Sequence, residues 1–530
     1  MNIRNACSAA IVAALAFAFP AAAGAQTVWT GATGSWFDAG NWSSGVPDGS
    51  ADARIDNAGT SGIASTGAAA HSIILGFDAP DSGTLQVDSS ATLDVAADLS
   101  VGYGGNGTLA IGAGAIVNDY SGEVGYTIQS DSGAHGDASV DGAGAQWNHA
   151  YELYVGYGTG TLAISNGASV HDVYGYLGYY PEFPGHSSGT ATIDGAGSVW
   201  TNDASLHIGD SGTGVVTVSN GGSLVNGEGD LGFNFDSDGT ATVTGAGSGW
   251  TTNGFFYVGN NGDGTLNVAD GGSVSSLGSY GYISWASAST GIANIDGAGS
   301  TWTNANGLYI GFGGAGFLTI SNGGTMQNGT FANVGFSPGA VGTLSVSGAG
   351  SMFGTGGALS IGGNVSGPGG TGSLRVDAGG AASAGTISVW NTGQLSLASA
   401  GSIAAATVTV DGRFDVTLGG ASIDGDLVLM PDATTGLGAD GGLAVSGAAA
   451  LAGSLTVGFG SGAIAPGQYT LLEAGGGLGG STFSSVTMTP PDGLTAEVTY
   501  DDTHVYVVVT STEPDDLLFR DGFDGTPGRR

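Results

Sequence analysis

The sequence predicts an all-β protein that folds as a parallel β-solenoid with repeats of roughly 51 residues. Glycine makes up 106 of the 530 residues, and short runs of alternating apolar and polar residues recur between turn residues. No helical period follows the N-terminal segment. Short, glycine-rich strands can stack as rungs of a solenoid, each pairing with the strand one coil above at about 4.8 Å. With about 25 residues in a coil, each repeat would contain two coils.

The repeat is defined by a phrase that begins with Asp141 and returns with an aromatic residue at its end. The aromatic residues are separated by 53, 50, 52 and 51 residues, and each is followed nine residues later by the glycine of an LYVG-like strand. These repeat aromatics are Trp147, Trp200, Trp250, Trp302 and Phe353. Replacement of tryptophan by phenylalanine favours internal packing, and a sugar-stacking ladder is the alternative.

A second set of aromatic residues lies within the LYVG-like strands. Tyr154 and Tyr309 each stand between two aliphatic residues, and Tyr257 stands between Phe256 and Val258. Because side chains alternate across a strand, we expect the aliphatic residues to point inward and the tyrosines outward. The three tyrosines are therefore a candidate contact stripe.

The charge balance argues against several classes of partner. All seven basic residues are arginine, and 44 acidic residues give a net charge of −37. Because nucleic acids and anionic membranes attract basic surfaces, we expect neither as a partner. A hydrophobic content of 41% is too high for a disordered chain.

The N-terminus predicts export. Arg4, the apolar run 9–19 and the small residues Ala23 to Ala25 fit a signal peptide at 1–25, with an uncleaved anchor as the alternative. Cys7, the sole cysteine, lies in this segment, so the mature chain would have no disulfide. We expect no transmembrane segment after it and an extracellular or outer-surface location, ahead of the periplasm.

The DGAGSxW, LYIG and GTLTISNGG phrases resemble the repeats of type V secretion (autotransporter) passengers and of proteins with a PEP-type sorting tail. This likeness covers about residues 96–385. The opening with Trp29, Trp36 and Trp42 resembles the start of the same surface proteins, and 467–507 resembles the end of a passenger before its barrel. The resemblance implies a right-handed β-helix from a Gram-negative bacterium, with a distal cap that promotes folding.

The C-terminus departs from that family. An eight-strand barrel needs about 80 residues, and we expect that the residues after Thr510 supply neither this translocator nor the apolar helix of a PEP-type tail. The end instead resembles a short LFxDGFD tail of secreted proteobacterial proteins. We interpret it as a sorting tail, with a frayed terminus as the alternative. Its residues are Phe519, Arg520, Asp521, Gly522 and Phe523.

These observations divide the chain into five segments. After the signal peptide we expect an N-terminal cap and first coils at 26–95 and the repeat solenoid at 96–385. Distal coils and a passenger-like cap follow at 386–510, and a flexible tail at 511–530. Caps are needed because an open solenoid end exposes unpaired backbone.

Motifs that could carry chemistry are weak. The GDSG at 209–212 lies at the turn of a repeat whose other copies lack the serine, and the GHSSG at 185–189 lacks the strand and helix of a nucleophile elbow. Arg54, Arg375 and Arg413 are far apart, which argues against a lyase site. We therefore predict no enzyme, with a polysaccharide lyase or hydrolase as the alternative.

No cofactor is expected. The seven histidines have no metal-ligand spacing. Asn234, Asp236 and Asp238 imitate half of an EF-hand loop, but Gly245 stands where the bidentate glutamate belongs, so calcium is only a weak alternative. The predicted function is a secreted or cell-surface structural or adhesive protein acting through an extended acidic surface on an unknown surface or glycan ligand. The alternatives are a carbohydrate-binding or carbohydrate-degrading β-helix and a passenger remnant with no binding role. The sequence does not predict an oligomeric state.

Overall fold

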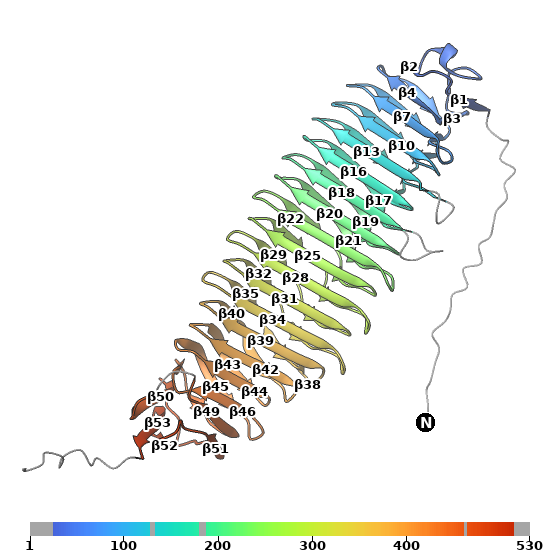
Figure 1. Cartoon of the computed structure of the whole chain (residues 1–530). Helices are drawn as coiled ribbons and strands as arrows, with labels where there is room; N and C mark the ends of the chain where they lie inside the picture. Colours follow the sequence, from blue (N-terminus) through green and yellow to red (C-terminus); the bar gives the residue numbers. More distant parts are fainter. Residues whose placement is uncertain (1–24, 128–132, 180–186, 461–463, 513–530) are drawn as a thin grey trace, which may run out of the picture.

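A computed structural model of the chain describes residues 25–127, 133–179, 187–460 and 464–512. They form a parallel β-solenoid of about 17 turns, as the repeat predicted (Figure 1). The predicted signal peptide at 1–25 lies outside this part of the chain, except for its last residue, and the predicted sorting tail lies wholly outside it. Among the residues described, no helix is long and apolar enough to cross a membrane.

Each coil contributes a long strand and two shorter ones. The long strands pair in sequence order and make one side of the solenoid, here called the long sheet. Its strands are β2 (Thr33–Ser35), β4 (Asn57–Ile63), β7 (Ser82–Val87), β10 (Asn106–Ile111), β13 (His135–Asp141), β16 (Thr159–Ser165), β18 (Ser188–Asp194), β20 (Thr213–Ser219), β22 (Asp238–Thr244), β25 (Asp263–Ala269), β28 (Thr290–Asp296), β31 (Ala315–Ser321), β34 (Val341–Ser347), β39 (Thr371–Asp377), β42 (Gly393–Ala398), β44 (Arg413–Thr417), β46 (Thr434–Gly438), β49 (Ser454–Gly458) and β51 (Ser485–Met488).

The next strand of each coil carries the repeat aromatic residue in every second coil, and these strands make the Trp face. They are β5 (Ala68–Ala70), β8 (Thr92–Val95), β11 (Ile116–Asp119), β14 (Gln146–His149), β23 (Gly249–Thr252), β26 (Ser273–Ser276), β29 (Thr301–Asn304), β32 (Thr325–Asn328), β35 (Met352–Thr355), β40 (Ala381–Ser383) and β47 (Leu443–Val445).

The third strand of each coil includes the LYVG-like phrase, and these strands make the Tyr face. They are β1 (Gln26–Val28), β3 (Asp52–Ile55), β6 (Ile73–Leu75), β9 (Asp98–Val101), β12 (Ser121–Val124), β15 (Glu152–Val155), β24 (Phe256–Val258), β27 (Gly281–Ile283), β30 (Leu308–Ile310), β33 (Ala332–Val334), β36 (Ala358–Ile361), β41 (Thr386–Val389) and β48 (Ala449–Ala450).

In five coils one strand runs through both shorter faces: β17 (Ser169–Leu177), β19 (Val199–Ile208), β21 (Ser223–Leu231), β43 (Ser402–Val410) and β45 (Ala421–Leu429). A small hairpin, β37 (Gly363–Asn364) with β38 (Gly367–Pro368), projects from one turn.

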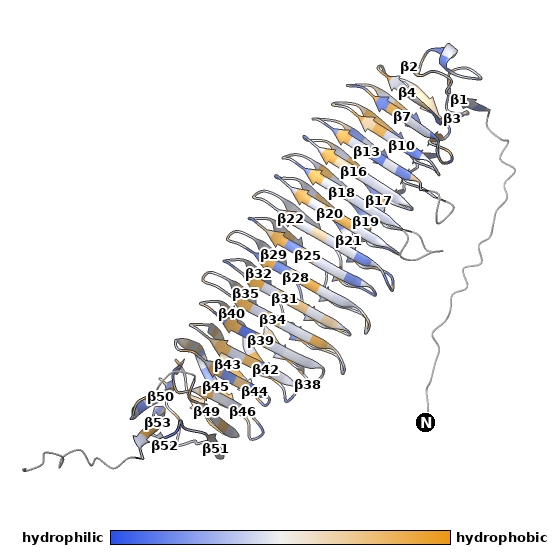
Figure 2. Ribbon diagram, in the orientation of Figure 1, coloured by the Kyte–Doolittle hydropathy of each residue, from blue (hydrophilic) through white to orange (hydrophobic). Residues whose placement is uncertain are grey.

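Side-chain alternation places one apolar row of every strand inside the solenoid. In β16, Gly160, Leu162 and Ile164 are buried while the residues between them are more exposed. Hydrophobic segments therefore recur at the same level on successive long-sheet strands (Figure 2). Because apolar residues of one coil stack on apolar residues of the next, the core continues from coil to coil.

The register confirms that one repeat contains two coils. Trp147 pairs with Val170, and Val170 pairs with Trp200 in the next coil. Leu224 then separates Trp200 from Trp250 in the same way. An aliphatic residue thus lies between successive aromatic residues of the column.

Serine hydroxyls link the turns between the long sheet and the Trp face to neighbouring coils through hydrogen bonds. Ser198 Oγ donates to the carbonyl of Asp194 at 2.7 Å and accepts the N–H of Gly167, one coil away, at 3.0 Å. The Asp194 carboxylate accepts from Ser219 and Asn220 of the following coil, both at 2.6 Å. Asp141 and Asp296 accept from the equivalent serine and asparagine, so the repeated aspartates are corner residues.

Both ends of the solenoid are covered. At the start, Trp42 packs edge-on against Trp29 and Trp36, beside the 3-10 helix η1 (Ala39–Asn41). At the other end, β50 (Gly467–Ala474) extends the Trp face and then pairs antiparallel with β53 (His504–Ser511). Strand β52 (Leu494–Tyr500) joins β53 through a hairpin turn at 501–503.

Candidate binding face

The Tyr face presents its tyrosines outward. In β15, β24 and β30 the aliphatic or aromatic neighbours of Tyr154, Tyr257 and Tyr309 are buried, and the three tyrosines are half-buried. The register adds Tyr176 and Tyr282 to the same column. We call these five residues the strand column. The sequence analysis missed the last two because their coils read GYLG and GYIS instead of LYVG.

A second aromatic column runs along the turns that end the Tyr-face strands. Each of its residues directly follows a position with positive φ, such as Gly311 at +72°, where an added Cβ would lie 2.2 Å from the Val341 carbonyl oxygen. All are half-buried. This turn column consists of Phe77, Tyr103, Tyr126, Tyr157, Tyr179, Phe233, Trp285, Phe312 and Phe336. The aromatic residue after the LYVG-like glycine was the signal that could have revealed it.

Rings stack within each column. Tyr282 lies 5.1 Å from Tyr257 and 5.0 Å from Tyr309, with interplanar angles of 8° and 5°. In the turn column, Trp285 and Phe312 stack at 4.3 Å and 5°. These distances match the spacing of about 4.8 Å between paired strands, so the fold itself sets the stacking.

Between the columns the rings meet edge to face. Tyr282 and Trp285 lie 4.6 Å apart at 80°, and Tyr309 and Phe312 lie 5.2 Å apart at 89°. Aromatic pairs favour both offset stacking and edge-to-face contact. The two columns together form one surface, which we call the aromatic ladder.

Acidic and polar side chains interrupt the ladder between Tyr176 and Tyr257. His207 and Asp230 occupy the strand column there, and Asp210 occupies the turn column. His207 Nδ1 lies 2.8 Å from an oxygen of Asp210, and Nε2 lies 3.7 Å from an oxygen of Asp230. Burial raises the pKa of Asp230 to about 7, although Asn260 donates to its carboxylate at 2.6 Å.

The phenols of the strand column stay neutral over the physiological range, because the pKa of each is raised. Burial, followed by nearby Tyr309 and Tyr280, raises the pKa of Tyr282 to about 12. Burial also raises the pKa of Tyr154, whose hydroxyl donates to Glu152 at 2.7 Å. The ladder therefore offers neutral hydroxyls and ring surface, flanked by carboxylates.

The structure places the five repeat aromatics inside the solenoid. Trp147, Trp200, Trp302 and Phe353 are fully buried, and Trp250 is 1% exposed. They are therefore not available to a ligand from outside.

Beside them runs an internal column of polar side chains that the sequence analysis missed. It can be traced by register from Asp172 through Asn202 and Asn226 to Thr252, all buried. The polar residue two positions after each tryptophan, as in Trp200-Thr201-Asn202, was its sequence signal.

The GDSG segment does not form a catalytic triad. Ser211 Oγ donates to Asp210 at 2.7 Å, and the same carboxylate holds His207. In a triad the histidine lies between the serine and the aspartate. The GHSSG segment falls partly outside the described residues. Within those residues, no three or more His, Cys, Asp or Glu side chains are placed to hold a metal ion.

No family model matches the sequence, and no curated protein matches it. Among solved structures, the chain is similar to a crystal structure of a TibA fragment hyper-glycosylated by TibC. The identity is 13% and the TM-score 0.25, and the alignment covers 77% of this chain and 92% of the other. The function must therefore be argued from the surfaces of this chain.

Proposed function

We propose that the chain is an exported structural or adhesive β-solenoid whose contact surface is the aromatic ladder. The observation that carries this proposal is the partly exposed ring surface that continues over successive coils on each side of the polar interruption. Of its rings only Tyr282 is buried, at 6% exposed. Soluble proteins rarely expose large contiguous apolar patches, and such patches mark interaction sites. The alternation that buries Leu153 and Val155 leaves Tyr154 to face outward, so the ladder is not a by-product of core packing.

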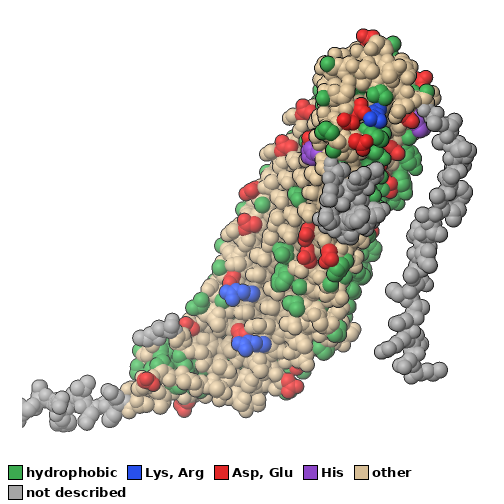
Figure 3. All heavy atoms as spheres, turned by 45° about the vertical axis from the view of Figure 1, so that its right-hand side comes forward, with side chains coloured by type: hydrophobic (Ala, Val, Ile, Leu, Met, Phe, Trp, Pro, Cys, Tyr) green, Lys and Arg blue, Asp and Glu red, His purple; other side chains and the backbone are tan. Residues whose placement is uncertain are grey.

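The surroundings of the ladder favour a neutral or positively charged partner. Acidic side chains are spread along the solenoid, and hydrophobic ones reach the surface among them (Figure 3). In the described residues the basic side chains are Arg54, Arg375 and Arg413, each paired with the aspartate two positions ahead. An anionic surface would therefore meet repulsion along most of the length.

The test compares a ladder variant with a matched surface variant. Trp285→Ser combined with Phe312→Ser removes one stacked pair of the turn column, and Phe235→Ser removes a ring that is 64% exposed and lies outside both columns. Retention of the mature chain would be measured on beads bearing hydroxyl, amine or carboxylate groups and on arrayed glycans, with melting curves to verify folding.

We expect retention of the unchanged chain on hydroxyl or amine surfaces. The ladder variant should bind about tenfold more weakly, which corresponds to ~1.4 kcal/mol, and Phe235→Ser should bind normally. Equal retention of both variants would show that the ladder is not the contact surface. Failure of the unchanged chain on every surface would favour a passenger remnant with no binding role.

Carbohydrate binding is the second candidate function. It is favoured by the phenol–carboxylate pair of Tyr154 and Glu152 at the edge of the ladder, because sugar hydroxyls both donate and accept hydrogen bonds. The glycan array separates the two candidates: binding to particular glycans with none to hydroxyl beads would favour the second.

A further inference from the structure

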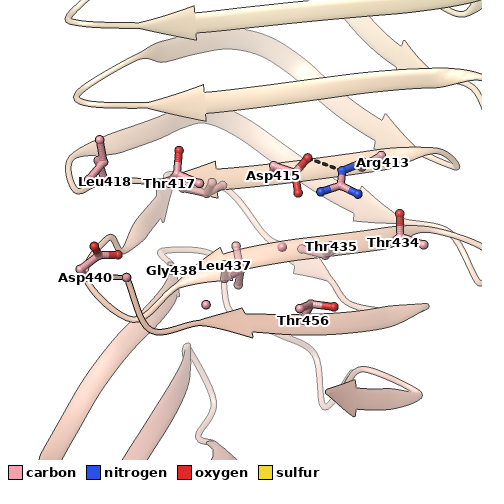
Figure 4. Close-up of a pocket in the computed structure, with 14 residues that line it drawn as sticks. Arg413, Asp415, Thr417, Leu418, Thr434, Thr435, Leu437, Gly438, Asp440 and Thr456 are labelled. Carbon is pink, nitrogen blue, oxygen red and sulfur yellow. Dashed lines mark hydrogen bonds and ion pairs between the residues drawn. The ribbon is translucent and has the colours of Figure 1, made fainter. Parts of the chain in front are cut away.

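A groove lies on the outer surface of the long sheet near its C-terminal end. It crosses β44, β46 and β49 and has a volume of about 510 Å³ (Figure 4). Binding sites for small molecules commonly measure roughly 300–1,000 Å³. The groove is far along the chain from the aromatic ladder, whose last ring is Phe336.

Missing side chains create the groove. Three outward positions of consecutive coils are glycine, at Gly436, Gly438 and Gly458. In an ordinary coil these outward positions carry side chains, as Thr242 and Thr244 do in β22. The hollow is therefore specific to these coils.

Two carboxylates lie over the glycine floor. A Cβ at Gly436 would meet Asp415 Oδ1 at 2.6 Å, and one at Gly438 would meet Asp440 Oδ1 at 2.6 Å. Asp440 follows β46 and lies at the opposite end of the groove from Arg413 (Figure 4). Glycine at these positions allows each carboxylate to approach the backbone.

Arg413 supplies hydrogen-bond donors to the groove. Its Nε donates to Asp415 Oδ2 at 2.5 Å, and the same oxygen accepts from Gln394 at 3.0 Å. The guanidinium is held from one side, while 62% of the side chain is exposed. It extends from β44 toward β46, so its remaining N–H groups can reach a bound molecule (Figure 4).

The opposite end of the groove has an apolar rim. Leu418 is 55% exposed and has a φ of +62°, a backbone conformation that leucine rarely adopts. Figure 4 shows it in the turn directly after β44, above Asp440 and at the same end of the groove. Thr434 and Thr456 add hydroxyl groups along the floor.

We propose that this groove is a binding site for a neutral oligosaccharide. Arg413 donates, Asp415 and Asp440 accept, and the threonine hydroxyls do both, which matches the mixed donor and acceptor character of sugar hydroxyls. Leu418 and the bare glycine backbone offer apolar contact to the carbon-bound hydrogens of a sugar ring. Two carboxylates against one guanidinium disfavour a polyanionic sugar. This site does not depend on the proposed role of the ladder.

Gly458→Val gives a sharp test, because a Cβ at this position meets nothing within 4 Å and its φ is not positive. The valine should fill the groove without disturbing the fold. Gly49→Val is the matched control, since it also adds a side chain into open space, but in the N-terminal cap. Asp440→Asn tests the acceptor.

The probes are neutral trisaccharides of α-1,4-linked glucose, β-1,4-linked glucose and β-1,4-linked N-acetylglucosamine, with trigalacturonate as the anionic comparison. Binding to the mature chain would be measured by saturation-transfer NMR and calorimetry. We expect at least one neutral trisaccharide to bind, Gly458→Val to lower its affinity about tenfold or more with an unchanged melting temperature, and Asp440→Asn to weaken it.

Gly49→Val and the ladder variant should bind this trisaccharide as the unchanged chain does. The proposal is wrong if no neutral trisaccharide binds, if Gly458→Val leaves binding unchanged, or if trigalacturonate binds best. Loss of binding in the ladder variant would show that the sugar binds to the ladder, and the proposed site in the groove would then be wrong.

Discussion

Trp147 donates its indole N–H to a carboxylate oxygen of Asp119, in the preceding coil, at 2.6 Å, and both side chains are buried. The next repeat makes the same contact, from Trp200 to Asp172 at 2.7 Å. In later repeats the acceptor is an amide or a hydroxyl. The tryptophan column therefore both fills the solenoid and fixes the register of each coil on the one before.

Trp200→Phe tests this double role. The variant keeps an aromatic ring, although a smaller one, and removes the donor to the buried Asp172 carboxylate, so we expect a loss of at least about 1–3 kcal/mol in the free energy of unfolding. Trp302→Phe should cost less, because its acceptor is the neutral Ser276 hydroxyl at 3.2 Å. Denaturant unfolding followed by circular dichroism would measure both, and an equal cost would contradict the hydrogen-bond argument.

Asp172→Asn tests the buried charge. Burial raises the pKa of Asp172 from about 3.8 to about 6 in the folded chain. The folded state thus binds the proton more tightly than the unfolded state, and the stability of the native chain relative to Asp172→Asn should rise as pH falls from about 6.5 to 4. The amide fits because Asn202 can turn its unpartnered Oδ1 toward it. A difference in melting temperature that does not change with pH would show that folding does not raise the pKa of Asp172.

Ser198→Ala should weaken the turn between coils. It leaves the Gly167 N–H without its acceptor and removes the bond to the Asp194 carbonyl, at an expected cost of about 1–2 kcal/mol. Ala145 stands at the equivalent position of the first copy, so Ala145→Ser is the reciprocal variant and should cost nothing. Thermal melting of both proteins checks the pair. If Ser198→Ala has the same melting temperature as the native chain, the serine does not stabilise the contact between coils.

Removal of the distal cap should expose the end of the solenoid. A chain that stops at Pro466 lacks β50, β51, β52 and β53, so β47 and β49 lose β50 and β51, the strands that pair with their outer edges. Open strand edges invite pairing with other chains. Light scattering after size exclusion should show large assemblies for this chain, whereas one that stops at Thr512 should keep the native size. Equal sizes would show that the cap is dispensable.

The sequence was sufficient to predict the solenoid because its determinants are local and periodic. The phrase ending at Trp200 and the following Leu206 to Gly209 fix a strand, a turn and the next strand, and their return every two coils fixes the stacking. The outward direction of Tyr154 followed from the alternation in its own strand. None of this required knowledge of distant contacts.

Features that depend on register were not predicted. Tyr176 and Tyr282 join the strand column only because their coils stack above and below the recognised ones. The groove was hidden for the same reason: Gly438 and Gly458 look like ordinary members of a glycine-rich sequence until pairing places them side by side. The residues of a column can be identified only when the lengths of the insertions between coils are known.

The arginine–aspartate pairs on the strands have a consequence for proteolysis. The chain has no lysine, and Arg54, Arg375 and Arg413 lie inside β3, β39 and β44, whose backbones pair on both sides. A trypsin-like enzyme needs a locally unfolded segment around the bond that it cuts. The whole stretch from Arg54 to Arg375, with both aromatic columns, should therefore survive such digestion as one uncut piece.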